Sequence, residues 1–189
     1  VCWALGIHPG FLTSATGPIM FGLDGMNQAA YAAGQPIHNI IGMAFSYSMT
    51  IAVLYPAFAL AVLIFSKSNQ LKTVGKISIA PAFFGISEPL MFGVPVVMNP
   101  FMAIPWIISP TVNVLLGWLA CSSGLVARYA GVTVFNFPMG VTGILNGSFT
   151  IAILEVVVCI IDVLIFMPFV RIQDKKYIDA EKAAETEQN

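Results

Sequence analysis

Two long stretches of the sequence, residues 37–66 and 101–127, contain no charged side chain, and this limits the possible folds more than any other feature. A third apolar stretch, residues 141–170, has only Glu155 and Asp162 as charged residues. About 20 consecutive apolar residues span a bilayer as an α-helix. We therefore predict one membrane-spanning helix in each of the three stretches.

The composition also indicates an all-α integral membrane protein. Hydrophobic residues make up 58% of the 189 residues and charged residues only 9%, against about 25% charged in soluble proteins. The net charge is −1 and the sequence has no basic block that could follow a nucleic-acid backbone, so we expect no nucleic-acid partner. Cys2, Cys121 and Cys159 have neither metal-ligand nor redox spacing, and we expect neither a metal nor a cofactor.

Basic residues indicate which side of the membrane each boundary faces. Residues 67–76 contain three lysines, and Arg171, Lys175 and Lys176 come directly after the last apolar stretch. Lys and Arg are enriched in cytoplasmic loops. We predict a cytoplasmic loop at 67–76, an extracytoplasmic loop at 128–140, and a cytoplasmic tail at 171–189 that is either a short exposed helix or disordered.

Both lysine-bearing boundaries must lie on the cytoplasmic side, and the two spans at 101–127 and 141–170 already return the chain to that side. The segment 77–100 must therefore enter and leave the membrane on one side. It contains six helix-breaking residues within twenty positions, which are Pro81, Gly85, Pro89, Gly93, Pro95 and Pro100. We predict a re-entrant hairpin of two short half-helices. Transporter substrate sites are often built from such broken helices.

The N-terminal segment, residues 1–36, is apolar but repeatedly interrupted by Gly and Pro. We predict a broken, partly inserted helical segment there. The chain starts at Val1 without a basic stretch ahead of a short apolar core, so we predict no signal peptide and expect that an upstream part is missing.

Glu88 is the only charged residue between positions 77 and 127, and it lies at the expected tip of the hairpin. An ionised carboxylate at the centre of a bilayer costs about 2.5–3.5 kcal/mol on insertion scales, so such a group normally faces a polar cavity. We interpret Glu88 as a binding-site residue. The alternative is a structural carboxylate that caps the half-helices.

Other polar residues of the apolar body have open roles. His8 is either an internally bonded donor or a ligand contact. Glu155 and Asp162 are seven residues apart on one helical face, and we favour polar partners within the bundle over an ion-coupling pair. A sugar site requires polar groups and an aromatic platform. The residues that could supply them are Glu88, His8, Asn27, Asn39, Asn99 and Phe135.

Several short motifs closely resemble those of the lactose/cellobiose-type sugar permeases, the EIIC membrane components of the bacterial phosphoenolpyruvate-dependent phosphotransferase system. They are Ser-Lys-Ser-Asn-Gln-Leu-Lys at 66–72, Pro81, Gly-Ile-Ser-Glu-Pro-Leu-Met-Phe-Gly-Val-Pro at 85–95, Asn-Pro at 99–100, Ile-Pro at 104–105, Gly-Ile-His at 6–8 and Pro-Phe at 168–169.

The resemblance implies a permease that binds a disaccharide such as cellobiose, lactose or chitobiose and carries it inward. It implies that Glu88 and His8 contact the sugar, with Glu88 orienting the C6 hydroxyl or accepting its proton. Cytosolic EIIB, supplied by EIIA, would phosphorylate that hydroxyl. This chain would be the transport component of the phosphotransferase complex, with no phosphoryl-carrying residue of its own.

The resemblance also implies a multi-pass protein of the bacterial cell membrane with a cytoplasmic C-terminus. The chain is similar to the substrate-binding, C-terminal half of these permeases, whose N-terminal half forms the homodimer interface. It departs from the family where Ser87 replaces Asn, where Pro9 follows His8, and where Phe-Asn-Phe-Pro at 135–138 replaces Trp-Thr-Thr-Pro. These departures leave the particular sugar open. The alternatives are an ion-coupled secondary sugar transporter and a truncated membrane fragment that does not transport.

Overall fold

The computed structural model describes residues 2, 6–8 and 10–187, and this part of the chain is helical with no β-strand. Three of its helices are long and apolar enough to cross a membrane: Met43–Phe65, Pro100–Ser122 and Phe149–Thr186. Each of them covers most of one of the three apolar stretches of the sequence, and the third extends beyond residue 170. The prediction of an all-α protein with three membrane-spanning helices is therefore confirmed.

The first of these helices is not uniform along its length. It consists of α2 (Met43–Tyr47), a π-helical turn (Ser48–Ala52) and α3 (Val53–Phe65). Pro56 lies inside α3, and its ring has no N–H to donate to the carbonyl four residues earlier, at Ala52. The wider π turn ends at that residue. Such turns are common at functional sites. In this one, Ser48 faces Glu155 of the last membrane-spanning helix and Thr50 faces a cavity beside the N-terminal helix.

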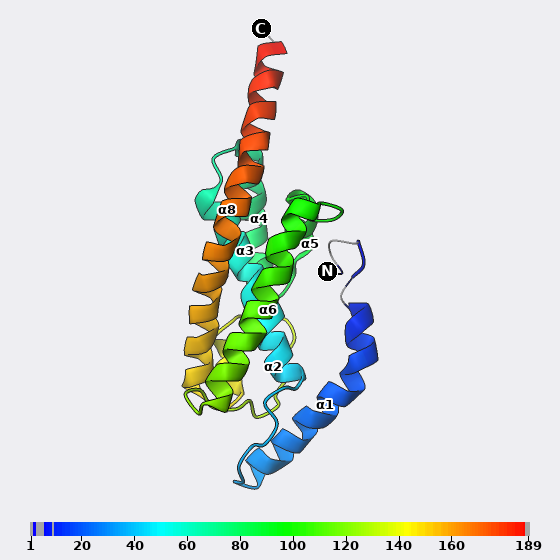
Figure 1. Cartoon of the computed structure of the whole chain (residues 1–189), viewed down its shortest axis with the longest axis vertical. Coiled ribbons are helices and arrows are strands. Elements are labelled where there is room, and N and C mark those ends of the chain that lie inside the picture. Colours follow the sequence, from blue (N-terminus) through cyan, green and yellow to red (C-terminus); the bar gives the residue numbers. More distant parts are fainter. Residues whose placement is uncertain (1, 3–5, 9, 188–189) are drawn as a thin grey trace.

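The hairpin segment consists of α4 (Asn69–Phe83) and α5 (Glu88–Gly93), joined by residues 84–87. Figure 1 shows α4 returning beside α3 from the end at which α3 stops, and α6 starting near that same end. The predicted loop at 67–76 is wrong for most of its length, because α4 already begins at Asn69. The start of α4 is stabilised by Asp174, which accepts hydrogen bonds from the backbone N–H groups of Lys67 and Ser68, the two residues before the helix.

The C-terminal half contains α6 (Pro100–Ser122), the short α7 (Val141–Leu145) and α8 (Phe149–Glu187). The last span therefore starts at Phe149, eight residues later than predicted. It also continues as one helix through Pro168 into the predicted tail and projects beyond the rest of the molecule (Figure 1). The tail is helical because it packs against α4: Glu181 accepts hydrogen bonds from the backbone N–H groups of Asn69 and Gln70.

The N-terminal segment differs from the prediction of a broken helix. Residues Gly10–Ala32 form a single helix, α1, with Pro18 inside it. One proline removes one intrahelical hydrogen bond, and here the chain tolerates this loss, so the helix is bent rather than interrupted (Figure 1). Residues 1, 3–5 and 9 of the segment, and Gln188 and Asn189 of the tail, lie outside the described residues.

An aromatic cluster holds the three long helices together. Phe58 of α3 packs on Trp106 of α6 and on Phe166 of α8, with ring centroids 5.3 and 4.7 Å apart, and Trp106 and Phe166 are 5.6 Å apart. Phe58 and Phe166 are fully buried. This contact fixes the bundle against which the hairpin and the π turn are placed.

Candidate functional site

A cavity of about 440 Å³ lies between α1, the π turn and the start of α3. This volume is within the range of about 300–1,000 Å³ typical of small-molecule sites. Its walls combine aromatic and methyl groups with hydroxyls. The polar and aromatic lining residues are His8, Thr13, Thr16, Ser46, Tyr47, Thr50, Tyr55 and Phe135.

His8 and Glu88 meet beside this cavity although eighty positions separate them in the sequence. The imidazole Nε2 of His8 lies 3.9 Å from Oε1 of Glu88. The other ring nitrogen, Nδ1, accepts a hydrogen bond of 3.0 Å from the backbone N–H of Gly10. A neutral imidazole has one donor and one acceptor nitrogen, so Nε2 carries the proton and faces the carboxylate.

Both side chains remain accessible to a ligand. The side chain of His8 is 68% exposed and that of Glu88 51% exposed. A distance of 3.9 Å is too long for a direct hydrogen bond. A hydroxyl oxygen placed roughly 2.8 Å from each group fits between them, accepting from the imidazole and donating to the carboxylate.

The turn before α5 determines where Glu88 points. Gly85 has a positive φ of 74°, and a Cβ atom there would lie 2.8 Å from the hydroxyl oxygen of Tyr47. The same Tyr47 oxygen accepts a hydrogen bond of 2.7 Å from the backbone N–H of Asn136, and its ring meets Phe135 edge-on at 5.3 Å. Tyr47 therefore links the hairpin turn to the aromatic wall of the cavity.

The three predicted asparagines are not among the residues that line this cavity. Asn27 donates to the carbonyls of Asn39 and Tyr129 and accepts from the N–H of Asn39, which joins α1 to two loops. Asn99 caps α6, accepting from the N–H groups of Phe101 and Met102. The structure thus places His8 and Phe135 in the cavity wall and Glu88 next to His8 but outside that lining, and it leaves Asn27, Asn39 and Asn99 at structural positions.

Glu155 is fully buried and bonded to several elements. Its Oε1 accepts hydrogen bonds from the hydroxyls of Ser48 and Thr142, and its Oε2 accepts one from the backbone N–H of Gly140. Ser48 is in turn 2.8 Å from the hydroxyl of Tyr129. This network joins α8 to the π turn, α7 and the adjacent loop, and it supports the interpretation of Glu155 as a polar partner within the bundle.

Asp162 is also fully buried but has a separate partner. Its Oδ2 accepts a hydrogen bond of 2.7 Å from the side-chain amide of Asn113 on α6. Glu155 and Asp162 therefore bond to different elements of the bundle. Within the described residues, no group of three or more His, Cys, Asp or Glu side chains is arranged to hold a metal ion.

Sequence reasoning missed the hydroxyl residues of the cavity wall. Ser46, Tyr47 and Thr50 lie in the stretch Phe45–Thr50, which has four hydroxyl side chains within an otherwise apolar run. That local density of hydroxyls was the available signal. The contribution of α1, through Thr13 and Thr16, had no comparable signal because it depends on how α1 packs.

The comparisons with known proteins agree with this architecture. A family model described as "Phosphotransferase system, EIIC" matches residues 1–110. The oligo-beta-mannoside-specific EIIC component of Bacillus subtilis (strain 168) is 35% identical over 96% of this chain and 43% of its own length. The cellobiose-specific EIIC component of Geobacillus stearothermophilus is 34% identical over 97% of this chain and 43% of its own length.

A solved structure is also similar. The crystal structure of the transporter ChbC, the IIC component from the N,N'-diacetylchitobiose-specific phosphotransferase system, superposes with a TM-score of 0.90 and 36% identity, over 95% of this chain and 43% of that one. The chain thus spans less than half the length of these relatives. From the match over residues 1–110 and the shared fold, the chain belongs to the EIIC family of the phosphotransferase system, a family of membrane-embedded proteins.

Proposed function

We propose that this chain forms the sugar-binding part of a phosphotransferase-system permease. It binds a disaccharide of the cellobiose, lactose or chitobiose kind, moves it inward and presents its C6 hydroxyl to a phosphorylated EIIB partner. The names of the relatives, which include cellobiose-specific and chitobiose-specific components, support this class of substrate.

The single observation that carries the proposal is the approach of His8 to Glu88. An imidazole N–H and a carboxylate oxygen 3.9 Å apart form a donor and acceptor pair for one hydroxyl group. Such a pair holds the hydroxyl in a defined direction, and the carboxylate accepts its proton when the oxygen attacks a phosphoryl group. This is the role we assign to Glu88.

The remaining walls suit the rest of a sugar. Phe135 is 52% exposed and offers its ring to an apolar pyranose face. Thr50 and Thr16 donate their hydroxyl protons to backbone carbonyls within their own helices, which leaves their oxygen lone pairs available as acceptors. The cavity therefore provides an aromatic platform with several acceptors for sugar hydroxyls.

The phosphoryl donor in this proposal is a separate domain or protein. One relative is a lactose-specific EIICB component of Lacticaseibacillus casei, 32% identical over 97% of this chain, and its name joins the two components. Cys121 and Cys159 of this chain are buried in the bundle, where a cytosolic phosphoryl carrier cannot reach them. We place the ends of the bundle that carry Lys67 and Lys175 on the cytoplasmic side, by the positive-inside rule.

The test is equilibrium binding of a panel of β-linked disaccharides to the intact protein that carries this chain. Replacing Glu88 with Gln removes a charge-assisted hydrogen bond, and we expect the Kd to rise roughly tenfold or more. The matched control is Asp179→Asn, which neutralises an exposed acid on the distal part of α8. Unchanged binding in the Glu88 variant would contradict the proposal.

The transport assay separates this proposal from its alternatives. A permease of this system requires phosphorylated EIIB and accumulates sugar phosphate. Uptake of unmodified sugar that collapses with an ion gradient would instead indicate an ion-coupled transporter. Failure of the intact protein to bind any sugar would favour a fragment with another role.

A further inference from the structure

A second cavity lies at the opposite end of α3 from the π turn, where α8 leaves the bundle. It has a volume of about 460 Å³, and its lining includes Ile64 and Phe65 of α3, Lys67, and Arg171 and Lys175 of α8. Arg171 and Lys175 are four residues apart and therefore share one face of the helix. Three basic side chains thus surround one cavity.

The positive charge of this cavity is not neutralised by ion pairs. Among the described residues, none of the three basic side chains forms a salt bridge. Asp174 also lines the cavity, but it is only 3% exposed. Its carboxylate oxygens accept three hydrogen bonds from Lys67 N–H and from the N–H and hydroxyl of Ser68, so they face the start of α4. The cavity keeps a net positive charge.

The cavity lies where two membrane-spanning helices leave the apolar region. α3 ends at Phe65, and Arg171 is the first charged residue of α8 after Asp162. On the apolar side, Ile64 is 59% exposed. The guanidinium of Arg171 lies 5.1 Å from the centroid of the Phe65 ring, which holds the cation directly above apolar surface. This order of groups matches the order within a phospholipid, with an acyl chain below a charged phosphate.

We propose that this cavity binds an anionic phospholipid, with its phosphate between Lys67, Arg171 and Lys175 and its upper acyl chain along Ile64. Basic pockets at the cytoplasmic ends of membrane helices recognise anionic headgroups in this way. The exposed isoleucine favours a lipid over a soluble anion. The inference is independent of the sugar site, which lies at the other end of α3.

The experiment measures lipid binding to the intact protein by native mass spectrometry. The probes are phosphatidylglycerol and phosphatidylcholine with identical acyl chains. We expect phosphatidylglycerol to bind more tightly, and each of Arg171→Gln and Lys175→Gln to weaken it roughly fivefold. The triple variant that also carries Lys67→Gln should lose the preference for the anionic lipid.

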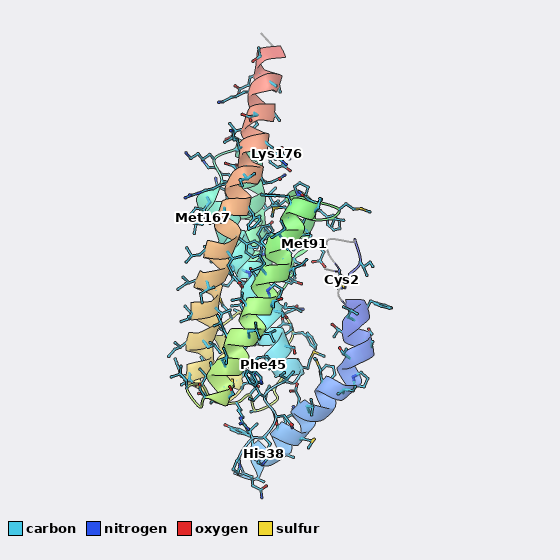
Figure 2. The ribbon with its side chains drawn as sticks, viewed as in Figure 1. Cys2, His38, Phe45, Met91, Met167 and Lys176 are labelled. Carbon is cyan, nitrogen blue, oxygen red and sulfur yellow. The ribbon has the colours of Figure 1, made fainter. Side chains whose placement is uncertain are left out.

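The matched control is Lys176→Gln, because Lys176 is the next residue on α8 but points to the ring of Phe101, 5.9 Å away. Figure 2 shows Lys176 on the part of α8 just beyond the bundle. This variant should keep the preference for phosphatidylglycerol, and thermal melting should show that all variants remain folded.

Three results would overturn the proposal. One is equal binding of the two lipids, and another is displacement of phosphatidylglycerol by millimolar glycerol phosphate, which would indicate a soluble phosphate site. The third is a triple variant that keeps its lipid preference but loses phosphorylation by EIIB, which would make the cavity a docking surface for that protein.

Discussion

At the scale of single residues, the carboxylates of the apolar body differ in what surrounds them. Glu155 accepts three hydrogen bonds and has no exposed surface, whereas the side chain of Glu88 is half exposed and faces His8. A carboxylate with all its bonds made inside the protein stabilises the fold. One that retains bonding capacity at a cavity is available to a ligand.

Glu155→Gln should therefore lower stability without changing sugar affinity. The glutamine oxygen can still accept from Ser48 and Thr142, but its NH₂ group would face the N–H of Gly140, a donor opposite a donor. We expect a loss of about 1–3 kcal/mol in the free energy of unfolding, seen as a lower melting temperature in detergent. Asp179→Asn serves again as the control. A stable variant whose uptake no longer depends on an ion gradient would instead assign Glu155 to ion coupling.

At the scale of elements, the turn between α4 and α5 depends on Gly85. In Gly85→Ala the new Cβ meets the Tyr47 hydroxyl in addition to the cost of a positive φ, which is about 1–2 kcal/mol for a non-glycine residue. Gly124 is the matched control, because its φ is also positive, at 77°, but a Cβ there has no neighbour within 4 Å. We expect Gly85→Ala to weaken sugar binding and Gly124→Ala to leave it unchanged.

Adding Tyr47→Phe to the Gly85 variant tests the cause. Tyr47→Phe relieves the contact but also removes the acceptor of the Asn136 N–H, so it should cost less stability in the Gly85→Ala background than in the wild-type protein. An equal loss of melting temperature in the two backgrounds would show that the backbone conformation, and not the contact, accounts for the effect of Gly85→Ala.

Much of this architecture could be predicted from the distribution of charges, because lipid excludes charge whatever the tertiary packing. The three spans and the isolation of Glu88 follow from it. The helix boundaries at 67–76 and in the tail could not be predicted from charge, because they depend on hydrogen bonds that Asp174 and Glu181 accept from the distant start of α4. The continuity of α1 through Pro18 could not be predicted for the same reason. Proline lowers the local helix propensity, but tertiary contacts can override that propensity.

At the scale of the whole molecule, the sugar site depends on attachments far from it. The N-terminal segment lies beside the loop between α5 and α6, where a Cβ on Gly6 would be 3.5 Å from Val97. Figure 2 shows Cys2 and His38 at opposite ends of α1. The attachments of α1 to the rest of the chain lie toward its His38 end. There Asp24 accepts from the N–H of Ala44 and the hydroxyl of Thr133, and Asn27 joins two loops.

Asn27→Ala should therefore weaken sugar binding although Asn27 does not line the cavity. The variant loses three hydrogen bonds of a side chain that is 2% exposed, and fewer molecules then hold α1 in the position that brings His8 to Glu88. The apparent Kd rises as the fraction of molecules with His8 next to Glu88 falls. Saturating sugar restores the bound state. Gln70→Ala, which truncates an exposed amide on α4, controls for the loss of an amide. An unchanged Kd in a destabilised Asn27 variant would mean that His8 reaches Glu88 without the α1 attachment.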